Sequence, residues 1–393
     1  MALLNPNLAA TLPPPVMEAR RWVDGKSFPA ERPLINVSQA APVDPPPEPM
    51  RQAMADAVLR QPETHLYGPV LGLPALRSEL AFNITRRYGG AVTAGNIAIT
   101  SGCNQAFCAA IATLAAPGDE VILPTPWYFN HKMWLDMSGV QAVPLATGED
   151  LMPDPDVARG LITSRTRAIV LVTPNNPTGA EYPPALIAAF RDLARAHRIA
   201  LILDETYRDF HSQPGPAHDL FADADWDDTV IQLYSFSKSY RLTGHRVGAI
   251  TTSPARLAEV EKFLDTVTIC PAQLGQHAAL WGLRNLDNWL AGERDEILSR
   301  AQAMRGGFAP LADKGWQLLG CGAYFSYLHH PFEMPSDELA QILVDQCAIL
   351  ALPGTMFTPA GDKAGAKQLR VAFANIDADG IATVQKRLAA FAP

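Results

Sequence analysis

A lysine in an apolar, hydroxyl-rich segment is the residue of this chain best suited to covalent chemistry. Lys238 lies in the stretch 235–246 (SFSKSYRLTGHR), directly after an apolar run. Burial and nearby positive charge lower the pKa of a lysine toward about 7–8, where the free amine can form a Schiff base. Ser235 and Arg246 flank it with a hydroxyl and a guanidinium, donors that suit a phosphate group. A surface lysine in a serine-rich loop is the alternative interpretation.

Two further polar segments follow apolar runs. Asp204 ends the run 200–204 (ALILD), and ligands of open α/β sheets bind at the carboxyl ends of strands. A carboxylate buried there needs a cationic partner, for which the protonated ring nitrogen of a cofactor is suited. Tyr207 supplies a phenolic O–H, and Asn176, in 173–179 (TPNNPTG), supplies a side-chain amide. A helix-capping aspartate and a plain turn are the alternatives for these two segments.

A fourth segment, 100–104 (TSGCN), lies between a predicted strand and a predicted helix. Backbone N–H groups at a helix N-terminus form an anion site, so the amides of Ser101, Gly102 and Cys103 are candidates for holding a phosphate. A simple N-cap by Ser101 explains the segment equally well.

The composition excludes several classes of protein. The chain has 393 residues and a net charge of -8, which argues against a nucleic-acid or anionic-membrane partner. Five cysteines without a CxxC pair suggest neither a zinc site nor a disulfide framework. With no signal-peptide pattern and no apolar run of about 18 residues, we expect a cytoplasmic protein without bound metal. The absence of GxGxxG and Walker motifs argues against a nucleotide-dependent enzyme.

The elements that must position these residues alternate along the chain. Short apolar runs without strict alternation are typical of strands buried on both faces of a parallel sheet, and helical segments separate several of them. This pattern predicts an α/β wound sheet. The first 49 residues are rich in proline and predict an extended arm and a turn-rich connector rather than a helix. The predicted strands are 96–100, 120–124, 140–145, 168–173, 200–204, 229–234 and 248–252, and the predicted helices are 50–59, 73–88, 101–115, 185–197, 255–266 and 284–304.

The four motifs, in this order, resemble the fold-type I aminotransferases of class I/II, which depend on pyridoxal 5'-phosphate (PLP). The resemblance covers nearly the whole chain. It implies a large domain (50–283) with a mostly parallel seven-stranded sheet between helices. It also implies a smaller α+β domain formed by the N-terminal arm (1–49) and the C-terminal part (284–393).

The resemblance also implies roles for individual residues. Lys238 matches the Schiff-base lysine, Asp204 matches the partner of the pyridinium nitrogen, and Tyr207 and Asn176 match donors to the phenolic oxygen. Arg370, in 369–375 (LRVAFAN), matches the arginine that binds the substrate α-carboxylate. The residues that match the phosphate cradle are Ser101, Gly102, Cys103, Ser235 and Arg246.

Further matches concern the cofactor ring and the partner subunit. Tyr128 falls where an aromatic residue stacks on the ring, with Trp127 as the competing candidate, and His131 matches a partner of Asp204 in some members. Tyr67 matches a tyrosine that reaches the phosphate bound by the neighbouring subunit. A homodimer with shared active sites is therefore expected.

Three departures from the family pattern bear on the substrate. Ala40 replaces a glycine beside the substrate side chain, and Cys270 stands where asparagine is common. No lysine or arginine occurs between Lys262 and Arg284, so the arginine with which some members bind a dicarboxylate is missing there. This disfavours aspartate or glutamate as the dedicated amino donor. Aromatic residues that could form an apolar pocket, or equally pack in the core, are Trp22, Phe28, Tyr324, Phe325 and Tyr327.

The expected function is the transfer of an amino group from a neutral or aromatic L-amino acid to a 2-oxo acid by a ping-pong Schiff-base mechanism. A C–S β-lyase or a related lyase on the same fold is the nearest alternative. A non-enzymatic regulator on the same scaffold is a third possibility. The intact Lys238, Asp204 and Arg246, and the lack of a DNA-binding segment, argue against it.

Overall fold

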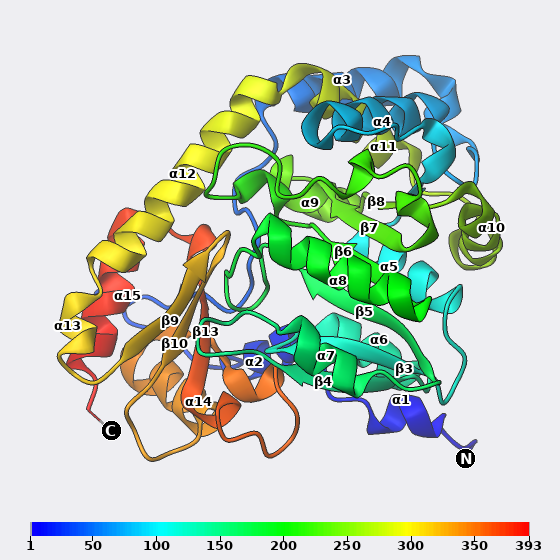
Figure 1. Ribbon diagram of the computed structural model, residues 1–393. Coiled ribbons are helices and arrows are strands. Elements are labelled where there is room, and N and C mark those ends of the chain that lie inside the picture. Colours follow the sequence, from blue (N-terminus) through cyan, green and yellow to red (C-terminus); the bar gives the residue numbers. More distant parts are fainter. Residues whose placement is uncertain (1, 393) are drawn as a thin grey trace.

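A seven-stranded sheet forms the centre of this protein in the computed structural model, which describes residues 2–392 (Figure 1). The strand order is β2-β8-β7-β6-β5-β3-β4. Strand β8 runs antiparallel to both of its neighbours, and the other adjacent pairs are parallel. The prediction of a mostly parallel seven-stranded sheet is therefore confirmed. The strands are β2 (Ile97–Thr100), β3 (Glu120–Thr125), β4 (Gln141–Ala146), β5 (Thr166–Val172), β6 (Ala200–Asp204), β7 (Val230–Ser235) and β8 (Gly248–Thr251).

Both faces of this sheet are covered, which explains why its strands are apolar without alternation. In β6, Leu201 and Leu203 pack into one core and Ile202 into another. The first core lies under α4 (Pro74–Tyr88), α8 (Pro184–His197) and α11 (Gln273–Asn285). The second lies under α5 (Cys103–Ala112) and α10 (Pro254–Thr268). Successive strand residues point to opposite faces, so each face requires its own apolar set.

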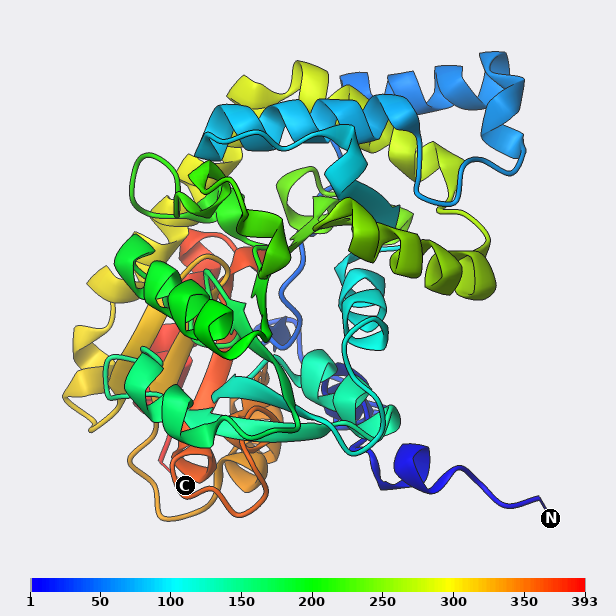
Figure 2. The same cartoon turned by 45° about the vertical axis from the view of Figure 1, so that its right-hand side comes forward.

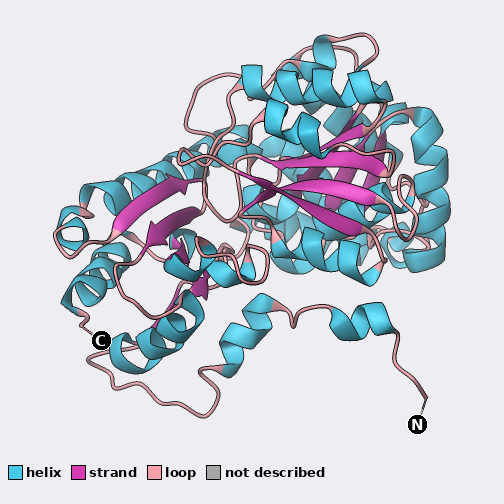
Figure 3. Ribbon diagram, turned by 60° about the horizontal axis from the view of Figure 1, so that its bottom comes forward, coloured by secondary structure: helices cyan, strands magenta, loops and turns pink. Residues whose placement is uncertain are grey.

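A second, smaller sheet lies apart from the first (Figure 3). It is antiparallel, in the order β12-β13-β10-β9, and has its own apolar core. The long helix α12 (Asp287–Gly306) runs from the large body toward this sheet (Figure 1). The helix predicted over 284–304 is in fact interrupted, because α11 ends at Asn285 and α12 begins after Leu286. The remaining elements here are α13 (Ala309–Ala312), β9 (Gln317–Gly322), β10 (Phe325–His329), α14 (Ser336–Cys347), β11 (Ile349–Leu350), β12 (Leu352–Pro353), β13 (Gln368–Ala372) and α15 (Ala378–Ala390).

The N-terminal stretch contradicts one prediction. Instead of an arm without helices it contains α1 (Pro6–Ala10) and α2 (Pro15–Arg21), and α3 (Glu48–Arg60) follows the prolines of the connector. The reason is positional, since proline at the start of a helix loses no hydrogen bond and already has a helical φ. The residues before α1 run away from the body (Figure 2).

Helix α2 lies between the two parts of the molecule. Its buried Ala19 belongs to a small apolar cluster with Phe129 and Leu352, one from each part. The N-terminal stretch also pairs with the C-terminal part, because β1 (Ile35–Asn36) runs parallel to β11. The predicted domain limits at residues 49 and 283 stay a prediction. None of the helices in residues 2–392 combines the length and hydropathy that crossing a bilayer requires.

Candidate active site

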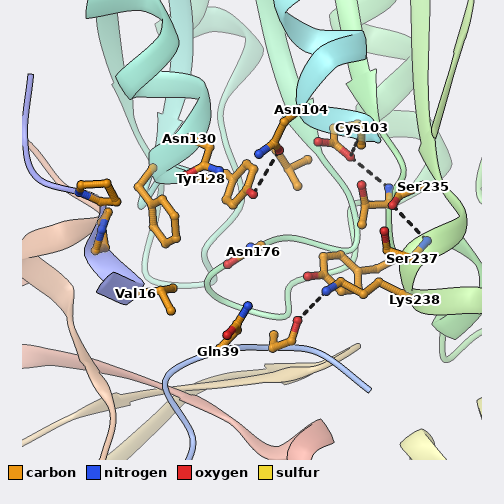
Figure 4. A pocket seen from close by; sticks show the side chains of 18 of the residues that line it. Val16, Gln39, Cys103, Asn104, Tyr128, Asn130, Asn176, Ser235, Ser237 and Lys238 are labelled. Carbon is orange, nitrogen blue, oxygen red and sulfur yellow. Dashed lines mark hydrogen bonds between the residues drawn. The ribbon is translucent and has the colours of Figure 1, made fainter. Parts of the chain in front are cut away.

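A cavity of about 420 Å³ lies at the carboxyl ends of the central strands (Figure 4). Residues from both parts of the molecule and from the N-terminal stretch line it. The predicted site residues that it brings together are Ala40, Cys103, Tyr128, Asn176, Asp204, Tyr207, Ser235, Lys238, Arg246 and Arg370.

Lys238 enters the cavity from α9 (Phe236–Ser239), a single turn that follows β7. Its Nζ donates a hydrogen bond to the Ala40 carbonyl, at 2.5 Å. Removal from bulk water, with the positive charges of Arg246 and Arg370, lowers the pKa of Lys238 to about 7. A large fraction of this amine is therefore unprotonated and nucleophilic at neutral pH.

Asp204 ends β6 with its side chain almost fully buried. Its Oδ2 lies 3.2 Å from His131 Nε2, and its Oδ1 accepts the Thr206 backbone N–H at 3.0 Å. Cys103 Sγ lies 3.8 Å from the same Oδ1. No lysine or arginine of residues 2–392 pairs with this carboxylate, so it has room for a cationic ligand atom.

Arg370 projects from β13 and is 2% exposed. Its Nη1 donates to Asn176 Oδ1 at 3.0 Å and its Nη2 to the Ser38 carbonyl, while its Nε has no partner within the described chain. Burial lowers the pKa of this guanidinium to about 10. A buried guanidinium without a carboxylate partner is suited to a carboxylate of the substrate.

An anion cradle lies beside Lys238. Arg246 Nη1 donates to Ser237 Oγ at 3.4 Å and to the Thr243 carbonyl at 3.0 Å. The cradle includes the start of α5, where a Cβ built on Gly102 would lie 2.2 Å from Arg246 Nη2. Gly102 also has a φ of +87°, a conformation that favours glycine.

Two of the predicted cradle residues do not line the cavity. They are Ser101 and Gly102. The Ser101 N–H donates to Gln105 Oε1 at 2.6 Å and is already used. Ser237 and Asn104, in contrast, line the cavity and were missed from the sequence. The second serine of 235–238 was a visible signal for the first of them, and the position after Cys103 pointed to the other.

Tyr128 and Trp127, the two candidates for stacking on the cofactor ring, lie in different environments. Tyr128 lines the cavity, meets the ring of His131 edge-on at 4.9 Å, and donates to Asn104 Oδ1 at 3.3 Å. Trp127 lies in the core on the α5 side of the sheet. Of the two, only Tyr128 faces the space where a planar ring would lie.

The N-terminal helix contributes a wall that the sequence did not reveal. Val16, Met17 and Arg20 of α2 line the cavity, together with Gln39. The aromatic residues that were candidates for an apolar pocket do not line it. Tyr324, Phe325 and Tyr327 are buried, and Trp22 and Phe28 lie in or beside the cluster under α2.

Tyr67 lies outside the cavity and is 81% exposed. Its neighbour Gly68 donates its backbone N–H to Cys270 Sγ at 3.4 Å, which places 66–68 beside the segment after α10.

The donor set fits PLP. An amine with a pKa near neutrality, a buried carboxylate without a cation and a cradle of hydroxyls, helix amides and a guanidinium meet the needs of an aldehyde, a protonated ring nitrogen and a phosphate. Among residues 2–392 no cluster of side chains suits a metal ion.

Comparison with known proteins gives consistent results. The family model described as aminotransferase class I and II matches residues 32–388. The aromatic aminotransferase ISS1 of Arabidopsis thaliana is 28% identical over 82% of this chain and 80% of its own length. The aspartate/prephenate aminotransferase of Thermus thermophilus is 28% identical over 84% of this chain and 85% of its own length. A solved structure of aspartate aminotransferase from Thermus thermophilus with maleate shares the fold, with a TM-score of 0.88, 24% identity and 99% of both chains covered.

Proposed function

Because the chain belongs to the class I and II aminotransferases, a family of PLP-dependent enzymes that transfer amino groups between amino acids and 2-oxo acids, we propose that Lys238, Asp204 and Arg370 carry its chemistry. The observation that supports this most directly is that Lys238, with a pKa of about 7, shares one cavity with the buried Arg370. The relatives named above are transaminases, which disfavours a lyase.

The cavity residues would hold PLP at its aldehyde, its ring nitrogen, its phenolic oxygen and its phosphate. Lys238 would bind the aldehyde carbon, Asp204 the ring nitrogen, and Tyr207 and Asn176 the phenolic oxygen. When bound, PLP supplies an electron sink for the bond broken at the substrate Cα. Tyr128 would cover the ring. The phosphate would be held by Ser235, Ser237, Arg246 and the amides at the start of α5.

The remaining chemistry belongs to the chain itself. Arg370 would bind the substrate α-carboxylate and so orient the Cα–H bond toward Lys238. An amine with a pKa of about 7 can take a proton from Cα and return it at neutral pH. Asn176 accepts a hydrogen bond from Arg370 through its Oδ1. One side chain would therefore contact both the cofactor and the arginine that binds the substrate.

The walls of the cavity support a neutral or aromatic substrate side chain. Val16, Met17 and Phe129 provide apolar surface, and Ala40 narrows the space beside it. Of the residues that line the cavity, Asp204 is the acidic one, and the ring nitrogen of PLP would occupy it. A cationic side chain would therefore find no free carboxylate there.

We also propose a homodimer in the cytoplasm. Apolar side chains are exposed on a face formed by 66–68 and 267–270, including Leu66, Tyr67 and Val267. An exposed apolar patch of this kind is typical of an interface, and Tyr67 would reach the partner's phosphate from it. All five cysteines are free, as expected in a reducing compartment.

Replacement of the lysine tests the assignment. We expect Lys238→Ala to lower amino transfer by about 10³-fold or more, because no other amine lines the cavity in the described chain. Borohydride reduction followed by peptide mass spectrometry should locate PLP on Lys238 in the wild type. Lys262→Ala, at an exposed lysine paired with Glu259, is the matched control. Full turnover by Lys238→Ala would refute the assignment, and pyruvate release from cystathionine without an oxo-acid acceptor would favour the lyase.

A further inference from the structure

One face of α2 borders the cavity. Pro15, Val16, Met17 and Arg20 line it. Ala19 is buried in the cluster with Phe129, and Val16 also packs against that cluster. The packing of Ala19 between the two parts fixes the position of α2. The helix thus holds an arginine at the edge of the catalytic cavity.

The charge of Arg20 is not neutralised by a carboxylate within residues 2–392. Its Nη2 donates to Gln39 Oε1 at 2.6 Å, and its Nη1 lies 4.0 Å from Met17 Sδ. The next residue, Arg21, does not line the cavity and pairs with Glu18 at 2.5 Å. An exposed guanidinium that one neutral amide orients retains donors for an anionic ligand.

Three consecutive residues connect Arg20 to the site. The Ser38 carbonyl accepts from Arg370, the Gln39 side chain accepts from Arg20, and the Ala40 carbonyl accepts from Lys238. Two guanidinium groups and the amine are therefore attached to one short stretch of chain along a single wall of the cavity. Gln39 projects from this wall in Figure 4.

We propose that Arg20 binds the distal carboxylate of a dicarboxylic amino or 2-oxo acid, such as glutamate or 2-oxoglutarate, while Arg370 binds its α-carboxylate. This assignment rests on the proposed function. Arg20 would supply the positive charge for a dicarboxylate that the segment between Lys262 and Arg284 lacks. The enzyme would then accept a dicarboxylate in one half of its reaction and a neutral amino acid in the other, with Val16 and Met17 beside the neutral side chain.

Binding of two unreactive acids of equal length tests the proposal in the holoenzyme. Glutarate carries both carboxylates and pentanoate only one, and calorimetry gives the dissociation constant of each. We expect Arg20→Gln to weaken glutarate about ten-fold or more and to leave pentanoate within about two-fold, because only glutarate loses a charge-assisted bond. Arg20→Lys should recover part of the loss. Arg21→Gln, at an arginine of α2 that does not line the cavity and pairs with Glu18, should change neither constant.

Two results would overturn the proposal. Equal weakening of glutarate and pentanoate by Arg20→Gln would show that Arg20 only shapes α2, and unchanged glutarate binding would show that Arg20 does not meet the ligand. Failure of the proposed function looks different. In that case the wild type would transfer no amino group from any amino acid, whatever the ratio of the two dissociation constants.

Discussion

Lys238 is made reactive by its surroundings, since removal from water and two nearby guanidinium groups disfavour its protonated form. With a pKa of about 7, the amine is mostly protonated below pH 6 and mostly free above pH 8. The rate at which the apoprotein captures PLP should therefore rise with pH through about 7 and then level off. Absorbance of the protein-bound cofactor, followed after rapid mixing at a series of pH values, measures this rate. A rate that rises only near pH 10 would contradict the lowered pKa.

Arg246 is the largest charge contribution to that shift. Arg246→Gln removes a positive charge beside the amine and should move the pH profile to higher pH. The probe should be pyridoxal without its phosphate, so that loss of the phosphate cradle does not affect the comparison. Arg256→Gln, at an arginine outside the cavity, should leave the profile in place. Equal profiles for both variants would mean that Arg246 does not contribute to the lowered pKa.

Asp204 should matter for turnover more than for retention of the cofactor. Asp204→Asn keeps the shape of the side chain but removes the charge that would stabilise a protonated ring nitrogen. We expect amino transfer to fall by about 10²–10³-fold, while the covalent adduct on Lys238 still forms. Steady-state rates and adduct mass measure the two effects separately. Asp136→Asn, at a carboxylate paired with Lys132 outside the cavity, is the control.

Among single residues, those that follow an apolar run directly could be assigned to the site from the sequence. Residues that reach the site only through packing between distant segments could not. Lys238 and Asp204 each follow an apolar run, so their positions could be inferred. The role of Arg20 depends on the packing of α2 through Ala19 and on the Gln39 contact, neither of which is visible in the sequence around it.

Among the elements, the segment that follows β6 sends some side chains into the cavity and others into the protein interior. Asp204 and Tyr207 line the cavity, whereas Glu205, Arg208 and Asp209 enter a buried polar network. This network connects the segment to α4, β7 and α9, because Asp209 contacts Arg87 at 2.5 Å, Tyr234 at 2.7 Å and Ser239 at 2.5 Å.

Asp209 should therefore support the positions of both Asp204 and Lys238. Burial alone would raise the pKa of Asp209, but Arg87 and Arg208 hold it below its ordinary value. Its contribution to stability is present above that ordinary value and is lost as the pH falls through the acidic range. Asp209→Ala removes the carboxylate that pairs with Arg87 and that lies 3.9 Å from the buried Arg208, and should lower the free energy of unfolding by about 3–5 kcal/mol in urea. Asp56→Ala, which breaks an exposed pair with Arg60, should cost less than about 1 kcal/mol.

The elements of the large sheet were predictable because both of its faces are buried. Strands such as β6 and helices such as α8 lie within about one residue of the predicted ranges. The direction of β8 was not predictable, because an apolar run has the same composition in a parallel or an antiparallel strand. The short helix α2 was missed because proline at its first position resembles the prolines of an extended arm.

At the scale of the whole molecule, the site requires segments that are far apart in the sequence. The N-terminal stretch supplies Arg20 and Ala40, the large body supplies Lys238, and the C-terminal part supplies Arg370. The pairing of β1 with β11 and the packing of α2 bring them together. The family resemblance implied two domains, but the side chains that meet between the parts depend on packing between distant segments.

The exposed apolar face allows the proposed homodimer to be tested. Val267, which is 58% exposed, lies on the same side as Tyr67, and Val157 in α7 (Pro155–Leu161) is 49% exposed elsewhere. If this face is an interface, Val267→Glu buries a charge on association and should shift the protein toward monomers, whereas Val157→Glu should not. Analytical ultracentrifugation over a range of concentrations gives the mass of each species. Because Tyr67 would hold the partner's phosphate, the Val267→Glu monomer should also bind PLP less tightly than the Val157→Glu protein. A wild type that stays monomeric at micromolar concentration, or a Val267→Glu monomer with unchanged affinity, would mean that each chain completes its own cofactor site.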